Sequence, residues 1–339
     1  MNISKKKILI VGGAGFIGHN LGVKLRDLQY EVTIVDSLAV NNLYSIEKDA
    51  DYIKFPELAR EIINERLSLI KSNKINFIIE DARNYHAISS IVEKTNPDFL
   101  IHLAAVSHSN KSNKTPHETF DHSLRTLENV LDALKKRSCH LIYLSSSMVY
   151  GNFKTDKVDE TTECDPIGIY GALKLSGERI VKAYNQVFGL KYTIVRPSAL
   201  YGERCISRRV GQIFIESALN KDKIYIDGDG SDMLDFTYIK DFIGGIVSII
   251  ENNKSENETF NLTFGQSRKI SSLIEILKSY FPNILIKNKE RDKFMPKRGT
   301  LSIEKAKNLL NYSPLWPIEK GYTQYIDWYK NFFKDKFKF

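Results

Sequence analysis

Residues 7–18 read KILIVGGAGFIG, a short apolar run that passes directly into glycines. The apolar run predicts a strand, and Gly12, Gly15 and Gly18 come where the next helix should begin. A tight turn, a close approach of the backbone to a pyrophosphate, and a close contact between helix and strand each require a residue without Cβ. Free N–H groups in the first helical turn attract the same anion. The stretch therefore predicts a dinucleotide-binding turn.

Five further apolar runs follow, with segments of helical period between them: EVTIVD, INFIIED, DFLIHLAA, HLIYLSSS and KYTIVRPS. Such runs are typical of strands that are buried on both faces of a parallel sheet. We predict an α/β fold, a Rossmann-like doubly wound parallel sheet with a smaller C-terminal substrate-binding lobe. The dinucleotide domain is placed at residues 1–195, rejoined by about 235–263, and the lobe at 196–234 and 264–339.

Two segments lie outside this alternation. Residues 37–75 form a long connection that contains PELAREIINERLSLIKS, whose apolar residues follow a helical spacing. We interpret it as a packing helix at the domain edge rather than as a functional lid. The terminal YTQYIDWYKNFFKDKFKF predicts a last helix with a frayed tail, and attachment to a membrane surface is a minor alternative.

Composition excludes several classes of function. The net charge of +8 is spread along all 339 residues without a compact basic stripe, so we expect no nucleic-acid partner. No apolar window approaches the ~18 residues of a membrane span. The three cysteines form no CxxC pair, and the histidines show no HExxH spacing. We expect a cytoplasmic protein with reduced thiols and no metal.

The second strand supplies the evidence for the type of dinucleotide. Asp36 ends that strand, where a carboxylate can accept hydrogen bonds from the adenosine ribose hydroxyls. The same carboxylate would repel a 2′-phosphate, and residues 37–40 contain no arginine to attract one. The sequence therefore favours NAD over NADP. Asp81, after the third strand, could reach the adenine edge or could cap the strand end, and these alternatives are equally supported.

Tyr170 and Lys174 form a YxxxK pair on one face of a predicted helix, and a row of serines, residues 145–147, ends the strand before it. A tyrosine that acts as a base near neutral pH must lower its pKa by about 3 units, or about 4 kcal/mol. One ammonium group supplies about 1–3 of these units. The oxidised nicotinamide ring would add a second positive charge, which would couple proton transfer to hydride transfer.

Together these motifs resemble an extended short-chain dehydrogenase/reductase of the NAD-dependent sugar-nucleotide epimerase/dehydratase family. The resemblance spans nearly the whole chain, including HLAA, SSSMVYG, RPSALYGE, GDGSDMLDFTYIKD and KRGTLSIEKAKNLL. It implies that Ser146 binds the reacting sugar oxygen, that Tyr170 is the base, and that Lys174 binds the nicotinamide ribose and lowers the tyrosine pKa. The implied cofactor-binding residues are Gly12, Gly15, Phe16, Ile17, Gly18, Asp36, Asp81, Ala82, Leu103, Ala104, Ala105, Tyr170 and Lys174.

Departures from the family pattern narrow the chemistry. Family dehydratases and decarboxylases carry an acid two residues after the catalytic hydroxyl, and the 3,5-epimerase/reductases carry a cysteine there, whereas this chain has Met148. Ala199 and Leu234 replace the asparagine and the diphosphate-binding arginine of many relatives, so other arginines should bind the diphosphate. The expected substrate-binding residues are Ser107, His108, Ser147, Met148, Arg204, Arg208, Arg209 and Arg298.

The main hypothesis is a sugar-nucleotide 4-dehydrogenase, which oxidises the C4 hydroxyl of a nucleoside-diphosphate sugar without eliminating water. The altered phosphate contacts favour it slightly over an NAD-dependent 4-epimerase. A resemblance to proteins of surface-polysaccharide pathways suggests a GDP-linked hexose or heptose. A third alternative is a non-catalytic NAD-sensing regulator, which the intact Ser146, Tyr170 and Lys174 disfavour. Helices expected near 122–136 and 171–188 allow the homodimer that is typical of relatives.

Overall fold

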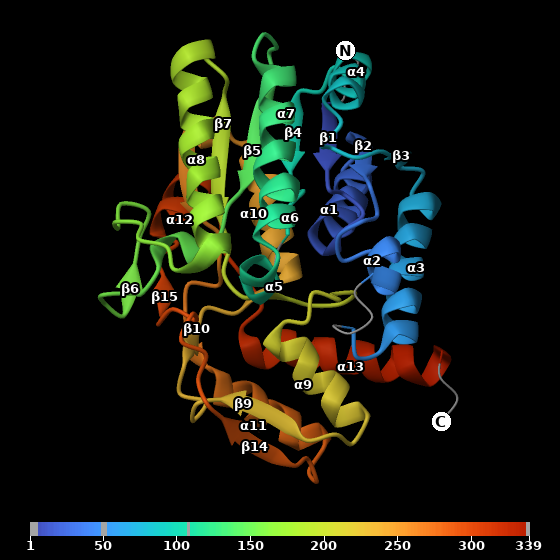
Figure 1. Ribbon diagram of the computed structural model, residues 1–339, viewed down its shortest axis with the longest axis vertical. Helices are drawn as coiled ribbons and strands as arrows, with labels where there is room; N and C mark the ends of the chain where they lie inside the picture. The colour runs from blue at the N-terminus through green and yellow to red at the C-terminus, as the bar shows by residue number, and fades with distance from the viewer. Residues whose placement is uncertain (1–5, 49–52, 107–108, 337–339) are drawn as a thin grey trace.

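The computed structural model describes residues 6–48, 53–106 and 109–336. A seven-stranded sheet forms its upper part, and every neighbouring pair of strands runs parallel (Figure 1). The predicted Rossmann-like fold is confirmed, since the chain order reverses next to β1. From one edge to the other, the strands are β12 (Glu258–Asn261), β7 (Tyr192–Arg196), β5 (His140–Leu144), β4 (Phe99–His102), β1 (Lys7–Val11), β2 (Glu31–Asp36) and β3 (Asn76–Ile79).

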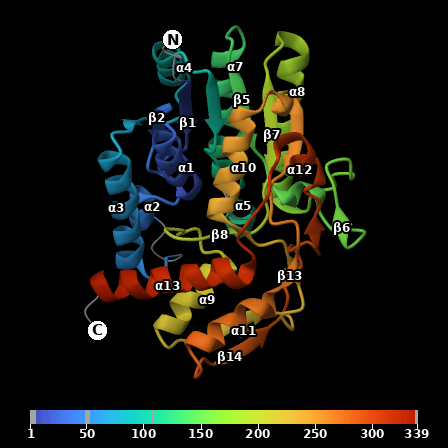
Figure 2. The ribbon, with the colours of Figure 1, turned by 180° about the vertical axis from the view of Figure 1, so that it is seen from behind.

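Helices cover both faces of the sheet because side chains alternate along each strand. Ile8 and Ile10 of β1 belong to a core shared with α1, α3 and α10, whereas Leu9 and Val11 belong to a core shared with α4, α7 and α8. Figure 1 shows α7 and α8 in front of the sheet, and Figure 2 shows α10 on the other side. These helices are α1 (Phe16–Asp27), α3 (Pro56–Ser72), α10 (Ile239–Glu251), α4 (Tyr85–Thr95), α7 (Thr126–Leu134) and α8 (Gly168–Phe188).

A smaller lobe lies below the sheet in Figure 1. Two parallel strands, β9 and β14, pair within it, and two antiparallel strands, β10 and β13, pair beside them. The return of the chain to the sheet occurs through α10 and β12, in the region where the sequence predicts it. The exact domain boundaries remain our proposal. The lobe contains α9 (Val210–Leu219), β9 (Ile224–Asp227), β10 (Met233–Leu234), β13 (Arg268–Lys269), α11 (Ile270–Tyr280), β14 (Ile286–Lys289) and α13 (Ile318–Lys336).

Short elements connect these parts. Two further parallel pairs, β8 with β11 and β6 with β15, lie where the chain crosses between the sheet and the lobe. The remaining elements are α2 (Leu43–Lys48), α5 (Ser109–Lys114), α6 (Pro116–Phe120), the π-helix η1 (Asp121–Arg125), the 3-10 helices η2 (Ser147–Tyr150) and η3 (Asn253–Ser255), β6 (Lys157–Val158), β8 (Leu200–Tyr201), β11 (Thr237–Tyr238), β15 (Thr300–Leu301) and α12 (Glu304–Leu310).

Each of the two segments outside the alternation contains a helix. Helix α3 covers Pro56–Ser72, the stretch that the helical spacing predicts. Helix α13 buries Tyr322, Tyr325 and Tyr329 completely, so these three aromatic residues belong to the core. In both ribbon views α13 passes the lower end of α3 (Figures 1 and 2).

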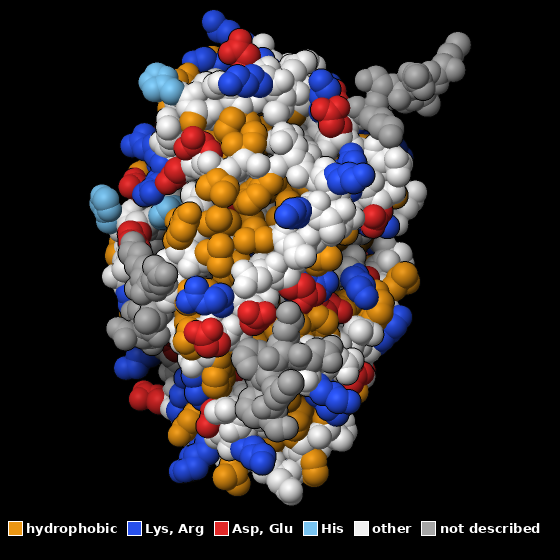
Figure 3. All heavy atoms as spheres, turned by 90° about the vertical axis from the view of Figure 1, so that its right-hand side faces the viewer, with side chains coloured by type: hydrophobic (Ala, Val, Ile, Leu, Met, Phe, Trp, Pro, Cys, Tyr) orange, Lys and Arg blue, Asp and Glu red, His pale blue; other side chains and the backbone are white. Residues whose placement is uncertain are grey.

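The outer surface mixes charges of both signs. On the side shown in Figure 3, Lys and Arg side chains are interspersed with Asp and Glu around an apolar area. Among the described residues, none of the helices has both the length and the apolar content needed to cross a membrane.

A buried ion pair joins three elements beneath the ends of β5 and β7. The guanidinium of Arg196 donates to both carboxylate oxygens of Glu178 on α8, through Nε at 2.9 Å and Nη2 at 2.7 Å. The Ser145 hydroxyl donates to the same carboxylate at 2.5 Å. Burial alone would lower the pKa of Arg196, but the bonds to Glu178 raise it. The pair therefore stabilises the charged form of Arg196.

Removing one partner of this pair should destabilise the fold strongly. We expect Arg196→Met to lower the free energy of unfolding by about 3–5 kcal/mol, because Glu178 would remain as a buried charge without a partner. The double variant Glu178→Met/Arg196→Met should regain much of that loss. Urea denaturation at neutral pH measures both values, and a single variant that loses under about 1 kcal/mol would contradict the expectation.

Candidate active site

A cavity of about 970 Å³ lies at the carboxyl ends of the parallel strands, where ligands bind in open α/β sheets. Strand ends line one side, with Val11, Val35 and Leu144. The lobe lines the other side, with residues such as Phe214 and Arg298. The cavity is thus formed by both parts of the chain. Its volume lies near the upper end of the roughly 300–1,000 Å³ that is typical of ligand sites.

The glycine turn takes the predicted form at the floor of the cavity. Gly12 has φ of 81°, and a Cβ there would lie 2.6 Å from the backbone nitrogen of Ala104. A Cβ on Gly18 would lie 2.4 Å from Cα of Gly13, so only glycine allows α1 to pack this closely on the turn. Helix α1 begins at Phe16, and no acidic side chain occupies its first turn. The residues of the turn that line the cavity are Gly12, Gly15, Phe16, Ile17 and Gly18.

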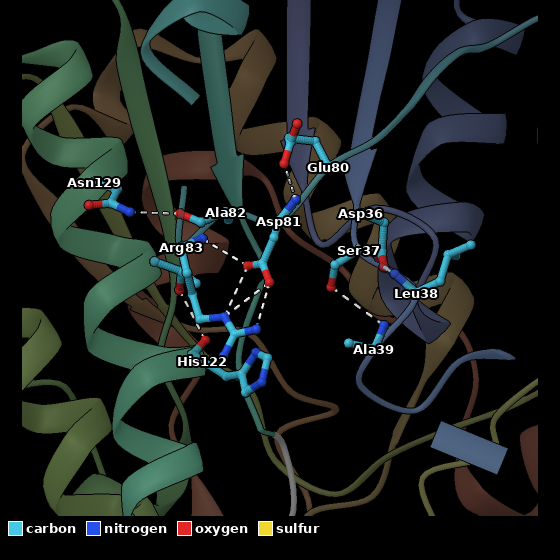
Figure 4. A network of polar contacts seen from close by, with 11 residues as sticks. Asp36, Ser37, Leu38, Ala39, Glu80, Asp81, Ala82, Arg83, His122 and Asn129 are labelled. Carbon is cyan, nitrogen blue, oxygen red and sulfur yellow. Dashed lines mark hydrogen bonds and ion pairs between the residues drawn. The ribbon is translucent and has the colours of Figure 1, made fainter. Parts of the chain in front are cut away.

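Asp36 lines the cavity beside this turn. One carboxylate oxygen accepts a hydrogen bond from the backbone N–H of Ala14 at 2.9 Å. The other accepts from the backbone N–H of Leu38 at 2.8 Å (Figure 4). Burial raises the pKa of Asp36, and these donors and Arg66 partly offset the rise. Each oxygen keeps lone pairs that a ribose hydroxyl could use. The geometry fits the diol of an adenosine ribose.

Asp81 lies differently from the adenine contact that the sequence allows. Its carboxylate accepts three hydrogen bonds from the Arg83 side chain, at 2.7–3.1 Å, and the ring of His122 lies next to this pair (Figure 4). Partial burial alone would raise the pKa of Asp81, but the bonds from Arg83 lower it. Asp81 does not line the cavity, whereas its neighbour Ala82 does. The structure therefore favours the strand-end role for Asp81.

Ser146 and Tyr170 meet at the centre of the cavity. Ser146 precedes the 3-10 helix η2, and its Oγ accepts a hydrogen bond from the Met148 backbone nitrogen at 3.2 Å. The Tyr170 side chain, from α8, also lines the cavity and lies near Ser146. Burial raises the pKa of Tyr170, and the positive charge of Arg209 counteracts this rise. The structure thus adds Arg209 as a cation that acts on the tyrosine, a role that the resemblance gave to Lys174.

Lys174 lies one helical turn beyond Tyr170 and also lines the cavity. Its ammonium donates to the Leu144 carbonyl oxygen at 2.7 Å, and its Nζ is 5.3 Å from the ring centroid of Tyr143. Burial lowers the pKa of Lys174 to about 8. His102 lies nearby in the core, where burial and the charge of Lys174 lower its pKa to about 3, so its imidazole is neutral.

The remaining predicted residues divide into three groups. Leu103, Ala104, Ala105, Ser147 and Met148 line the cavity, and Met148 is buried beside Ser146. Ser107 and His108 lie outside the described residues. The third group comprises the predicted arginines.

Three of the four predicted arginines, Arg208, Arg209 and Arg298, line the cavity. Arg204 does not: its Nε lies 3.6 Å from a Glu65 carboxylate oxygen, and its guanidinium lies 5.9 Å from the ring centroid of Trp328. Because residues 202–209 carry positive φ angles at Arg204 and Arg208, neighbouring side chains point in different directions. Arg204 is thus a structural link to α3 and α13.

Sequence reasoning missed Arg291, which lines the same cavity and donates through Nε to both oxygens of Asp232, at 2.9 and 3.1 Å. Within the described part of the chain, Arg291 Nη2, Arg209 Nε and Arg298 Nε are buried without a hydrogen-bond partner. Burial and the like charge of Arg209 lower the pKa of Arg298 to about 10. Buried guanidinium groups of like charge that keep unpaired N–H donors are typical of a site that binds an anion.

The fold and the glycine turn are those of a dinucleotide-binding protein of the extended short-chain dehydrogenase/reductase type. The chain belongs to the NAD-dependent epimerase/dehydratase family, whose model matches residues 8–263. A putative UDP-glucose 4-epimerase of Methanocaldococcus jannaschii is 29% identical, covering 96% of this chain and 98% of that protein. A UDP-glucuronate 4-epimerase of Thermodesulfobacterium geofontis is 29% identical, covering 95% of each. The crystal structure of UDP-glucuronic acid 4-epimerase from Bacillus cereus, in complex with UDP-glucuronic acid and NAD, superposes with a TM-score of 0.85 at 27% identity, covering 96% of this chain and 99% of that one.

The buried Lys174 should make the stability of the cofactor-free protein depend on pH. Its pKa of about 8 lies below that of an unfolded lysine, so between these values the unfolded state binds more protons and stability rises with pH. Lys174→Met removes this dependence. Between about pH 7.5 and 9.5, the unfolding free energy of the parent should therefore rise by about 2 kcal/mol relative to that of the variant. A difference that stays constant in denaturation curves over this range would contradict the prediction.

Proposed function

We propose that this protein is an NAD-dependent sugar-nucleotide 4-epimerase. The single observation that carries the proposal is that Ser146 and Tyr170 lie near one another in a cavity that also contains Lys174 and a set of buried arginines. A sugar bound there would have one hydroxyl at the base and its diphosphate among the arginines. A protein that only senses the cofactor has no need of the part of the cavity that contains the arginines.

The chain's own groups can divide the chemistry as follows. Ser146 and Tyr170 hold the C4 oxygen, and Tyr170 accepts its proton while Arg209 stabilises the phenolate. NAD, when bound, supplies a reversible hydride acceptor at C4. Lys174 would donate to the hydroxyls of the nicotinamide ribose. After the 4-keto sugar has turned its opposite face toward the nicotinamide, C4 would regain the hydride on that face and Tyr170 would return the proton to the C4 oxygen, while the arginines continue to hold the diphosphate.

Epimerisation is favoured over release of a keto sugar. The preference for a dehydrogenase depended on the missing phosphate-binding arginine at Leu234. Arg291 and Arg298 place positive charge in the same cavity. The altered phosphate contacts therefore no longer favour a dehydrogenase over an epimerase. Relatives that are named as 4-epimerases match along nearly the whole chain. Met148 offers no proton to a leaving hydroxyl, which supports redox chemistry without elimination.

The substrate that we propose is a UDP-linked hexose or hexuronate, in place of the GDP-linked sugar suggested earlier by the resemblance. The names of the relatives carry UDP, and the Bacillus cereus enzyme was crystallised with a UDP-linked uronic acid. The pair of Arg209 and Arg298 can neutralise the two charges of a diphosphate, because planar guanidinium groups match phosphate oxygens well.

A panel of sugar nucleotides tests the activity. Purified protein is incubated with UDP-glucose, UDP-glucuronate, UDP-N-acetylglucosamine and GDP-mannose, and the products are analysed by mass spectrometry and proton NMR. We expect a C4 epimer of unchanged mass from a UDP-sugar, without net formation of reduced nicotinamide. Loss of two hydrogens would favour the dehydrogenase instead, and loss of water would overturn the interpretation of Met148.

Tyr170→Phe tests the assigned base. Because the variant keeps the ring but loses the group that accepts the proton, we expect kcat to fall by about 10²–10⁴-fold with little change in KM. Tyr184→Phe is the matched control, since Tyr184 lies on the same helix but does not line the cavity. Steady-state kinetics measures both, and an unchanged kcat in Tyr170→Phe would refute the role.

A further inference from the structure

Arg66 is a completely buried charge in the middle of α3. Within the described residues, its hydrogen bonds all end on backbone carbonyls of two separate loops. Nη1 donates to the carbonyl of Asn41 at 3.3 Å. Nε donates to the carbonyl of Arg204 at 2.9 Å, and Nη2 donates to the same oxygen. One guanidinium therefore joins two loops that are far apart in the sequence.

The first of these loops, residues 36–42, is called the cofactor loop because it begins with Asp36. It is tied to the glycine turn at both ends. Asp36 accepts from the Ala14 nitrogen at 2.9 Å, and the Asn42 side chain donates to the Ala14 carbonyl at 3.2 Å. Leu38 and Asn41 take positive φ angles of 59° and 50°, so outside contacts must hold its shape.

The second loop, residues 202–209, is called the substrate loop because its end lines the cavity with Ser207, Arg208 and Arg209. It also contains non-glycine residues with positive φ, 64° at Arg204 and 51° at Arg208. Such conformations persist only where the surroundings impose them. Arg66 imposes one of them by binding the carbonyl of Arg204.

We propose that Arg66 is a positioning residue that couples the cofactor loop to the substrate loop, so that NAD and the nucleotide sugar each favour binding of the other. The sugar-nucleotide part of this inference rests on the function proposed above. In this arrangement, a cofactor that fixes Asp36 and the cofactor loop also fixes the carbonyl of Asn41. The guanidinium is thereby held in place for the carbonyl of Arg204.

The coupling has a simple physical origin. Because Arg66 has no exposed surface, water cannot replace a carbonyl that moves away. If either loop shifts, a charged donor loses its partner in the protein interior, and the remaining bonds are rearranged. Both loops are therefore stable together or displaced together. Their states are linked by the reciprocity that governs any two sites coupled through one element.

Hydrogen exchange tests this coupling with NAD alone. In the wild-type protein freed of cofactor, adding NAD should slow amide exchange in residues 202–209 as well as in 36–42. In Arg66→Lys, which keeps the charge but cannot span two carbonyls, NAD should still slow exchange in 36–42 and should leave 202–209 nearly unchanged. Equal protection of both loops in the variant, or no protection of 202–209 in the wild type, would overturn the proposal.

A binding cycle gives the size of the coupling. The affinity for UDP is measured by calorimetric titration with and without saturating NAD. In the wild type, NAD should raise this affinity several-fold, since coupling between two sites is typically about 5–150-fold. The gain should fall to near unity in Arg66→Lys, while the UDP affinity of the cofactor-free protein changes little. Arg66→Met, which loses both carbonyl contacts, should behave in the same way.

Arg60→Gln serves as the control on the same helix, since Arg60 is half-exposed and lies 4.0 Å from Glu57 at its closest. The control should retain both the protection by NAD and the gain in UDP affinity. A control that loses them as Arg66→Lys does would overturn the specific role of Arg66. Failure of the wild-type protein to bind UDP would count against the proposed function alone, and the exchange experiment would still decide the inference.

Discussion

The site depends on the bidentate pair between Glu178 and Arg196. Ser146 comes from the end of β5 and Tyr170 from α8, and a proton can pass between them and a sugar only if both stay within hydrogen-bond distance. The carboxylate of Glu178 binds the strand side through Ser145 and the neighbouring strand through Arg196, so these elements cannot slide past one another. Arg196 also donates to Tyr150, which in turn donates to Asn261 of β12. The strand that returns from the lobe is thereby tied to the same pair.

Much of the fold could be predicted because its signals are local. An apolar run, a glycine turn or a helical spacing is determined by residues that are close together in the sequence, and α3 begins and ends where its spacing indicates. That Ser146 and Tyr170 share a site was implied by the family resemblance, and the structure brings both side chains to the same cavity. Loops are different, because their side-chain directions depend on backbone angles and on distant partners. Thus the carboxylate of Asp81 binds the Arg83 side chain, and the Arg204 side chain contacts α3 and α13. Arg66 did leave a signal, a charge on the apolar face of α3 one turn after Ile62, but its partners could not be inferred.

The electrostatics of the cavity oppose stability and favour binding. Lys174 is buried, and the like charges of Arg209 and Arg298 repel one another. A protein selected only for stability would replace these groups by apolar ones of similar size. Their positions become favourable once a diphosphate neutralises the arginines and a phenolate forms beside Arg209. Net charge is a poor guide to this site, because the relevant charges are a few buried ones and not the many on the surface.

A 4-epimerase places two opposed demands on such a cavity. The hydroxyl of Ser146 and the phenol of Tyr170 must keep one position through both halves of the reaction, whereas the sugar must turn between them. Rigid ion pairing of side chains beneath β5 and β7 meets the first demand. The second is better met from the lobe, where the cavity arginines lie on loops rather than on the central sheet. A link through Arg66 to backbone carbonyls suits this side, because it holds the substrate loop in register with the bound cofactor without fixing the side chains that contact the sugar.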